Sequence, residues 1–189
     1  MRQRPNDAPS ELEIARWVRD GRTGSQVAYA RLFDRFAPLV HSILLGRFRP
    51  AIADELTQEC FLTAFDRLGQ LNDGEKFGAW IATIARRIRP EKAIHEVDSG
   101  ELESHPSAES SPEASADADR MLRIISNLSE AYREILMLRL VEGMSGPEIA
   151  ALTGLTPGSV RVNLHRGMQQ LRVAAGMGHG KTEVEWTNE

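Results

Sequence analysis

Polar and basic side chains near the C-terminus of this 189-residue chain have the chemistry that contact with DNA requires. Arginine donates to phosphates and guanine edges, asparagine can pair with an adenine edge, and serine bonds phosphate oxygens. No Asp or Glu occurs from Ile149 through Thr182, so no carboxylate there opposes a phosphate. We therefore expect a DNA-reading surface formed by Ser159, Arg161, Asn163, His165 and Arg166.

Two amphipathic helices separated by Gly154-Leu155-Thr156 would position these side chains. Gly154 can take the left-handed conformation that ends a helix. Thr156 is a favourable N-cap and Pro157 a favourable first helical residue, so a second helix can begin at once. Two helices that cross through so short a turn form a helix-turn-helix. Apolar residues recur along the second helix at spacings of four, four and three, as Val160, Leu164, Met168 and Leu171.

The same pattern would suit an ordinary helical hairpin whose arginines only solvate its outer face. The ordered residues Glu148-Ile149-Ala150, Gly154, Val160 and Arg166, preceded by the helix-like REILMLRLVEGMS, favour the DNA-reading interpretation. This region resembles the C-terminal region of RNA polymerase sigma factors of the sigma-70 family, and within it the extracytoplasmic-function group. Because it would also suit the output domain of a response regulator, the first half of the chain has to distinguish the two.

Three segments of the first half are similar to the other main region of the same family. They are YARLFDRFAPLV at 29–40, DELTQECF at 54–61 and FGAWIATIARR at 77–87, in the family's order and spacing. Ahead of them Ser10 and Glu13 form a capping box, and Gly21 is expected to end the first helix. The resemblance covers about residues 10–92 and 120–175. It implies an all-α protein of two small helical domains, the first over 1–92 and the second over 121–175.

The helix that contains DELTQECF carries polar side chains on its outer side. Carboxylates in a first turn stabilise a helix N-terminus, which is one role for them. The resemblance implies a second role, because this helix is where such factors dock on the clamp helices of the largest polymerase subunit. The candidate polymerase contacts are Asp54, Glu55, Gln58 and Glu59.

The helix that contains FGAWIATIARR is expected to bury its apolar residues and to expose its basic ones. The resemblance implies that this helix opens the DNA duplex at the promoter element nearest the start site and holds the opened strand. Aromatic and basic groups there receive an unstacked base and its backbone. Core packing is the alternative role for the tryptophan. The candidate contacts with this proximal element are Lys76, Trp80, Arg86 and Arg87.

The sequence departs from the family's pattern at three places. Pro90 removes a backbone donor and disfavours helix at Arg89, whereas the family's helix usually continues into a strongly basic stretch. Arg87 stands where Asn is common, and Asn163 stands where Arg or Lys is frequent. The differences at Pro90 and Arg87 bear on promoter opening, and the difference at Asn163 bears on sequence preference.

The net charge of −4 becomes favourable to DNA binding once it is divided along the chain. Residues 96–119 hold eight acidic side chains and no Lys or Arg, so the remainder carries +4. This segment is rich in Ser, Ala, Pro and Glu and predicts a flexible acidic linker over 93–120. Such a linker is a solvated spacer or, alternatively, a DNA mimic that competes for the basic surfaces. Residues 176–189 form a short tail without a recognisable motif.

Composition excludes several other classes of protein. No apolar run approaches the roughly 20 residues of a membrane helix, and the N-terminus lacks the apolar core of a signal peptide, so we expect a cytoplasmic protein without membrane insertion. The single cysteine, Cys60, is expected to be a small apolar filler rather than a redox switch. There is no metal-ligand spacing, phosphate-binding Gly loop or nucleophile motif, so neither a cofactor nor enzymatic activity is expected. His165 is accordingly expected to face solvent or a phosphate.

The sequence thus predicts a transcription initiation factor that binds core RNA polymerase and promoter DNA. By resemblance an anti-sigma factor is a possible further partner. Two alternatives remain at this point: a helix-turn-helix regulator that never joins the polymerase, and a degenerate sigma-like adaptor that opens no promoter.

Overall fold

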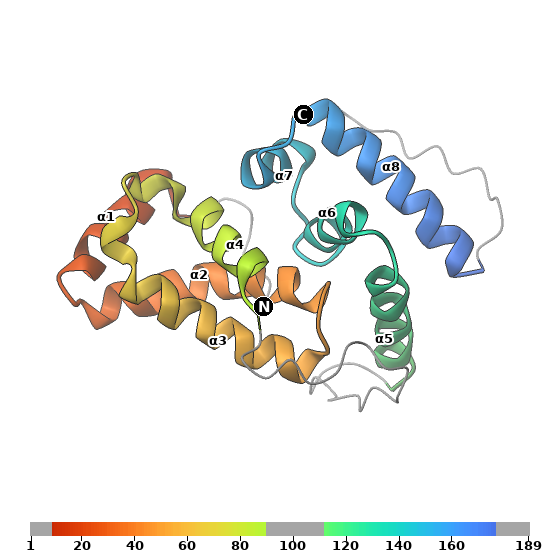
Figure 1. The fold of residues 1–189 in the computed structure, drawn as a ribbon, viewed down its shortest axis with the longest axis horizontal. Helices are drawn as coiled ribbons and strands as arrows, with labels where there is room; N and C mark the ends of the chain where they lie inside the picture. The colour runs from red at the N-terminus through yellow and green to blue at the C-terminus, as the bar shows by residue number, and fades with distance from the viewer. Residues whose placement is uncertain (1–8, 90–111, 177–189) are drawn as a thin grey trace.

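The computed structural model describes residues 9–89 and 112–176, and these residues form an all-α fold, as predicted (Figure 1). No strand occurs in this part of the chain. Two short 3-10 turns, Leu68–Gln70 and Gly74–Lys76, connect α3 to α4. The helices are α1 (Glu11–Arg22), α2 (Gln26–Leu45), α3 (Pro50–Asp66), α4 (Phe77–Arg87), α5 (Pro112–Ser126), α6 (Glu130–Leu140), α7 (Gly146–Thr153) and α8 (Pro157–Ala174).

The first helix begins as predicted and ends later than predicted. Ser10 and Glu13 form the capping box, with the Ser10 amide 2.9 Å from the Glu13 carboxylate. Gly21 does not end α1, because the helix continues to Arg22 and the chain turns at Gly24, where φ is 85°. Gly21 is instead buried, and a side chain there would collide with Leu68. The glycine marks a close helix contact rather than a turn.

Aromatic side chains join α2 to α3 and α4. Tyr29 stacks on Phe65 with ring centroids 4.4 Å apart, and Phe36 meets Phe77 at 5.2 Å. Phe77, the first residue of α4, is fully buried. Such pairs contribute about 0.5 to 1.5 kcal/mol beyond the area they bury. They fix the positions of α3 and α4, the two helices of the first half that carry candidate contacts.

The helix-turn-helix forms as its sequence predicts. Gly154 ends α7 in the left-handed conformation with φ of 73°, and the Thr156 side chain accepts from the Ser159 amide to cap α8. Ser145 and Glu148 add a capping box at the start of α7. Gly167 lies in the middle of α8, where a glycine weakens a helix by about 1 kcal/mol. Its buried position lets α8 approach Leu136 of α6, since a Cβ there would lie only 3.2 Å from that side chain.

The predicted linker over 93–120 was too long at its C-terminal end. The chain is helical from Pro112, where α5 begins, so the last acidic residues of the expected linker belong to a helix. Residues 90–111, with Pro90 and most of the acidic segment, lie outside the described residues, as does the tail from 177 onward.

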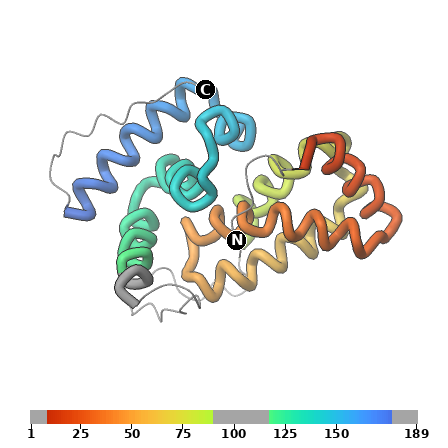
Figure 2. Tube along the Cα trace, turned by 180° about the vertical axis from the view of Figure 1, so that it is seen from behind, coloured from red at the N-terminus to blue at the C-terminus, as the bar shows by residue number. Residues whose placement is uncertain are grey.

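The two halves of the chain share one apolar core in this structure. Ile135 and Leu138 of α6 and Ile149 of α7 belong to the same buried cluster as the core of α1 to α4. Figures 1 and 2 show α6 between α8 on one side and α2 and α4 on the other. The interpretation as two domains held only by a tether did not anticipate this contact.

Cys60 lies inside the first half and has no exposed surface, as a small apolar filler should. Burial, reinforced by the neighbouring charge of Glu59, raises the pKa of Cys60 to about 12. Since the thiolate is the reactive form, the buried thiol is inert at neutral pH.

We therefore predict that iodoacetamide at pH 8 leaves Cys60 unmodified in the native protein and alkylates it in concentrated urea, as read by intact mass. Free glutathione, an exposed thiol, serves as the reactivity control in both buffers. Rapid modification of the native protein at a rate close to that of glutathione would contradict the buried, protonated state.

Candidate nucleic-acid interface

The outward face of α8 carries most of the side chains expected to read DNA. Val160, Leu164 and Leu171 are buried against the rest of the second half, as their spacing predicted. Ser159, Arg161, His165 and Arg166 are exposed, whereas Asn163 is half-buried. Four of the five candidates thus remain available to a nucleic acid, and Asn163 is turned toward the flank of the helix.

One exposed residue of this face was absent from the sequence-based set. Val162 is 46% exposed although it is apolar. Its neighbours at positions three and four along the helix are Gly158, Ser159, His165 and Arg166, all exposed. The helical period could have located it, because Val162 lies about 200° from both Val160 and Leu164. A selection of polar residues alone passes over such a position.

The N-terminal turn of α8 is held rigidly. The hydroxyls of Thr156 and Ser159 lie 2.9 Å apart, and the Ser159 amide donates to Thr156 at 3.1 Å. Ser159 therefore serves the helix cap, whatever else it contacts. The fixed start of α8 gives the exposed side chains that follow a defined orientation.

Trp80 and Arg87 lie on one face of α4, and Lys76 precedes the helix as its N-cap residue. The spacing of seven residues between Trp80 and Arg87 returns to nearly the same side of the helix, whereas the Lys76 ammonium lies 3.4 Å from the Asp73 carboxylate. Lys76 and Arg87 are exposed, and Trp80 is half-buried with its ring 5.9 Å from that of Phe77. Trp80 is thus packed against the core and only partly exposed. Trp80 and Arg87 lie about 10 Å apart along the helix axis rather than forming a cluster.

Arg86, expected to be exposed, is instead directed toward the second half of the chain. Its Nε and Nη2 atoms donate to both carboxylate oxygens of Glu134 on α6 at 2.6 to 3.1 Å. The two side chains are only 27% and 20% exposed. The sequence-based expectation was wrong about this exposure because Arg86 lies about 100° around α4 from Arg87, on the side that faces the second half of the chain.

The C-terminal end of α4 is also tied to α2. Arg47, just after α2, donates from Nη1 to the carbonyl oxygens of Ala85 and Arg86 at 3.0 and 2.9 Å. Partial burial lowers the pKa of Arg47, and a cation at a helix C-terminus is electrostatically favourable. The last turn of α4, which carries Arg86 and Arg87, is therefore positioned by residues from both halves of the chain.

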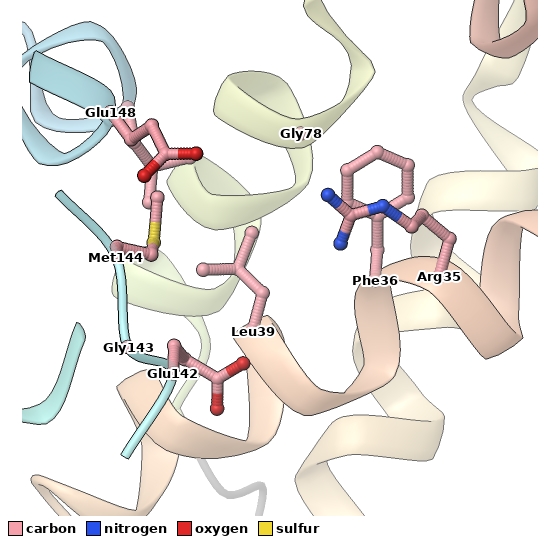
Figure 3. Close-up of a pocket in the computed structure, with 9 residues that line it drawn as sticks. Arg35, Phe36, Leu39, Gly78, Glu142, Gly143, Met144 and Glu148 are labelled. Carbon is pink, nitrogen blue, oxygen red and sulfur yellow. The ribbon is translucent and has the colours of Figure 1, made fainter. Parts of the chain in front are cut away.

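A cavity of about 240 Å³ remains where the halves meet (Figure 3). Figure 3 shows Arg35, Phe36 and Leu39 of α2 facing Met144 and Glu148 of the second half. Beside it Ser42 of α2 donates to the carboxylate of Glu142. The contact between the halves is thus partly polar and incompletely filled.

The outer face of α3 presents all four candidate polymerase contacts. Asp54, Glu55, Gln58 and Glu59 are exposed, and His41 of α2 lies 3.0 Å from the Asp54 carboxylate. Leu62, one turn beyond Gln58, is 71% exposed on the same face. The sequence-based set omitted this apolar side chain for the same reason as Val162. The face combines an acidic rim with a protruding apolar residue.

Comparison with known protein families identifies both halves. Residues 32–88 match the model of Sigma-70 region 2, and residues 118–171 match that of Sigma-70, region 4. A DNA-reading helix-turn-helix joined to this helical unit defines a promoter-recognition factor. The chain belongs to the sigma-70 family of RNA polymerase sigma factors, in its extracytoplasmic-function (ECF) group, and is a transcription initiation factor that directs the polymerase to promoters.

Curated relatives agree over most of the chain. The RNA polymerase sigma factor CarQ of Myxococcus xanthus is 33% identical over 162 residues, which cover 82% of this chain and 93% of CarQ. The ECF sigma factor BldN of Streptomyces coelicolor is 28% identical, over 89% of this chain and 68% of BldN. SigW of Bacillus subtilis is 23% identical, over 86% of this chain and 96% of SigW.

Solved structures share the fold. CnrH, in complex with the cytosolic domain of CnrY, superposes with a TM-score of 0.63 at 20% identity, covering 88% of this chain and 99% of that one. RpoE of Bartonella quintana, in complex with the anti-sigma factor NepR, has a TM-score of 0.54 at 18% identity, covering 80% and 98%. Within residues 9–89 and 112–176, no helix has the length and apolar character needed to cross a membrane.

The contact between Arg86 and Glu134 can be measured by a double-mutant cycle. We predict that R86A, E134A and the double variant give a coupling energy of about 1 to 3 kcal/mol in urea unfolding, because two partly buried ions share bidentate hydrogen bonds. The matched control is the exposed pair Arg16 and Asp20, 3.8 Å apart, whose coupling should stay below about 0.5 kcal/mol. A coupling no larger than that of the control would show that the halves do not close on each other in solution.

Proposed function

We propose that α8 reads the distal promoter element in the major groove while α3 docks on core RNA polymerase and α4 engages the proximal element. The observation that carries the assignment of α8 is its outward face, which presents Arg161, His165 and Arg166 to solvent with no carboxylate on the helix. Helix-turn-helix proteins place the N-terminal residues of their second helix against base edges. Arg161 and Arg166 supply base or phosphate contacts, and half-buried Asn163 has a lesser part.

Docking of α3 rests on charge and exposure together. Its outer face combines the carboxylates of Asp54, Glu55 and Glu59 with the amide of Gln58 and exposed Leu62. An apolar side chain within a polar rim is the pattern of a protein contact rather than of a nucleic-acid contact, since carboxylates repel phosphates. Leu62 provides the apolar anchor, and the surrounding polar groups set specificity.

Engagement of the proximal element by α4 uses Lys76, Trp80 and Arg87. The exposed part of the Trp80 ring offers a surface on which an unstacked base can stack, and Lys76 and Arg87 supply cations for the backbone. Arg86 joins this set only when Glu134 releases it. The free chain is therefore expected to bind promoter DNA poorly. Separation of the two halves on the polymerase is expected to release Arg86 for contact with DNA.

The same proposal implies a cellular compartment and a set of partners for the chain. The chain acts in the cytoplasm as a binding subunit of the polymerase rather than as an enzyme. An anti-sigma factor is a fitting further partner, because RpoE of Bartonella quintana, which shares this fold, is bound to one. Such a partner would act by holding the polymerase-docking or DNA-reading faces.

The test is run-off transcription with purified chain, core RNA polymerase and a library of genomic promoter fragments. Specific initiation supports the proposed function. Polymerase binding without initiation would identify the adaptor that opens no promoter, and promoter binding without polymerase binding would identify an independent helix-turn-helix regulator. Tight, sequence-specific binding by the free chain would refute the role given to the polymerase.

Variants of α8 test the reading helix directly. R161A and R166A are each expected to reduce initiation at a cognate promoter by roughly 5- to 150-fold if the arginine contacts a base edge, the range of 1 to 3 kcal/mol per contact. A phosphate contact would instead lower the salt slope of promoter binding by about one unit. The control is R16A, which removes an exposed arginine from α1 and should leave initiation unchanged. Unchanged promoter use by both α8 variants would overturn the assignment.

A further inference from the structure

The centre of the DNA-reading face of α8 is an apolar side chain. Val160 and Leu164, two residues to either side of Val162, are 0% and 4% exposed, so both point into the second half. A residue about 200° from each of them on a helix points directly away from that core. Val162 thus lies at the centre of the face that a docking body would cover.

The surroundings of Val162 are open and polar. Gly158, one turn earlier, has no side chain, and a Cβ built there would meet only the Thr156 hydroxyl, at 3.9 Å. A surface can therefore approach the helix closely beside Val162. Exposed Ser159 and Arg166 flank Val162 on the helix surface, so this single apolar side chain lies among hydrogen-bonding groups.

Nothing in the fold itself favours valine at this position. Its branched Cβ lowers helix propensity, and at 46% exposure much of the side chain remains in water. Single exposed apolar residues are common on proteins, so exposure alone decides nothing. The position of Val162 on the DNA-reading face is what indicates a role in recognition. Thymine is the base that presents a methyl group in the major groove, and an apolar side chain can recognise that group.

We propose that Val162 determines sequence preference by contacting the C5 methyl group of a thymine in the distal promoter element. The proposal rests on the proposed function of α8 and adds a residue to it. Arg161 and Arg166 hold the helix in the groove by charge and hydrogen bonds, and Val162 selects a base by shape and apolar contact. Burial of one methyl group changes affinity roughly fourfold, which sets the size of the expected preference.

The experiment removes the methyl group from the DNA. Holoenzyme assembled from the full chain and core RNA polymerase first selects its preferred distal element from a randomised library. Each thymine of that element is then replaced by deoxyuridine, which lacks only the C5 methyl group. With the wild-type chain we expect one or two positions at which the replacement weakens promoter binding roughly fourfold.

The matching protein variants are V162A and V173A. V162A should weaken binding to the thymine promoter and lose all sensitivity to deoxyuridine. V173A trims a 65% exposed valine on the same face about 16 Å further along α8, and should keep the wild-type sensitivity. Both sites are exposed and alanine favours helix, so both variants should retain the wild-type unfolding midpoint.

The outcomes separate this proposal from the function on which it depends. If the holoenzyme selects no distal sequence, the role of α8 fails and this proposal fails with it. If it selects one and initiates there, but no thymine is sensitive to methyl removal, only the proposal for Val162 is overturned. The same conclusion follows if the selected element contains no thymine or if V162A retains the deoxyuridine penalty.

Discussion

The packing of α6 against the C-terminal part of α2 is the contact on which the arrangement of the molecule depends. Gly46 lies buried at the end of α2, where a Cβ would come within 3.3 Å of Arg133 and Met137 of α6. This close approach brings Ile135 and Leu138 into the core of the first half and sets Glu134 opposite Arg86. Arg47, the next residue along, holds the end of α4 in the place where that pair can form. This contact and the direct packing of α7 against α4 together fix the position of the helix-turn-helix relative to α4.

The contact between the halves combines residues of the shared apolar core with polar groups. An ion pair, a hydrogen bond from Ser42 to Glu142 and a cavity of about 240 Å³ accompany its apolar residues. Interfaces between domains of one chain are commonly more polar than the obligate interfaces between subunits. In this arrangement the outer faces of α3 and α8 are exposed, and Arg86 of α4 is paired with Glu134.

Local chemistry made part of this structure predictable. Caps and turns depend on residues within four positions of one another, so the box at Ser10, the left-handed Gly154 and the cap at Thr156 were all readable from sequence. Arg86 and Gly21 are covered by elements that are distant in the sequence. The periodicity of apolar residues within one helix does not reveal such contacts. Val162 and Leu62 were missed for a different reason. Their exposure follows from the helical period, but a prediction based only on polar side chains does not include apolar contact residues.

The distribution of charge explains how a chain of net charge −4 can present itself to DNA in one orientation. The exposed carboxylates of Asp54, Glu55 and Glu59 gather on α3, and α8 has none. At physiological salt, charges influence one another over about 8 Å, so each face acts on a partner nearly independently of the other. Phosphates are attracted to α8 and repelled from α3, which leaves α3 free for a protein partner while α8 lies on the duplex. The net charge alone would have argued against DNA binding, and it is the segregation of charge between helices that removes the objection.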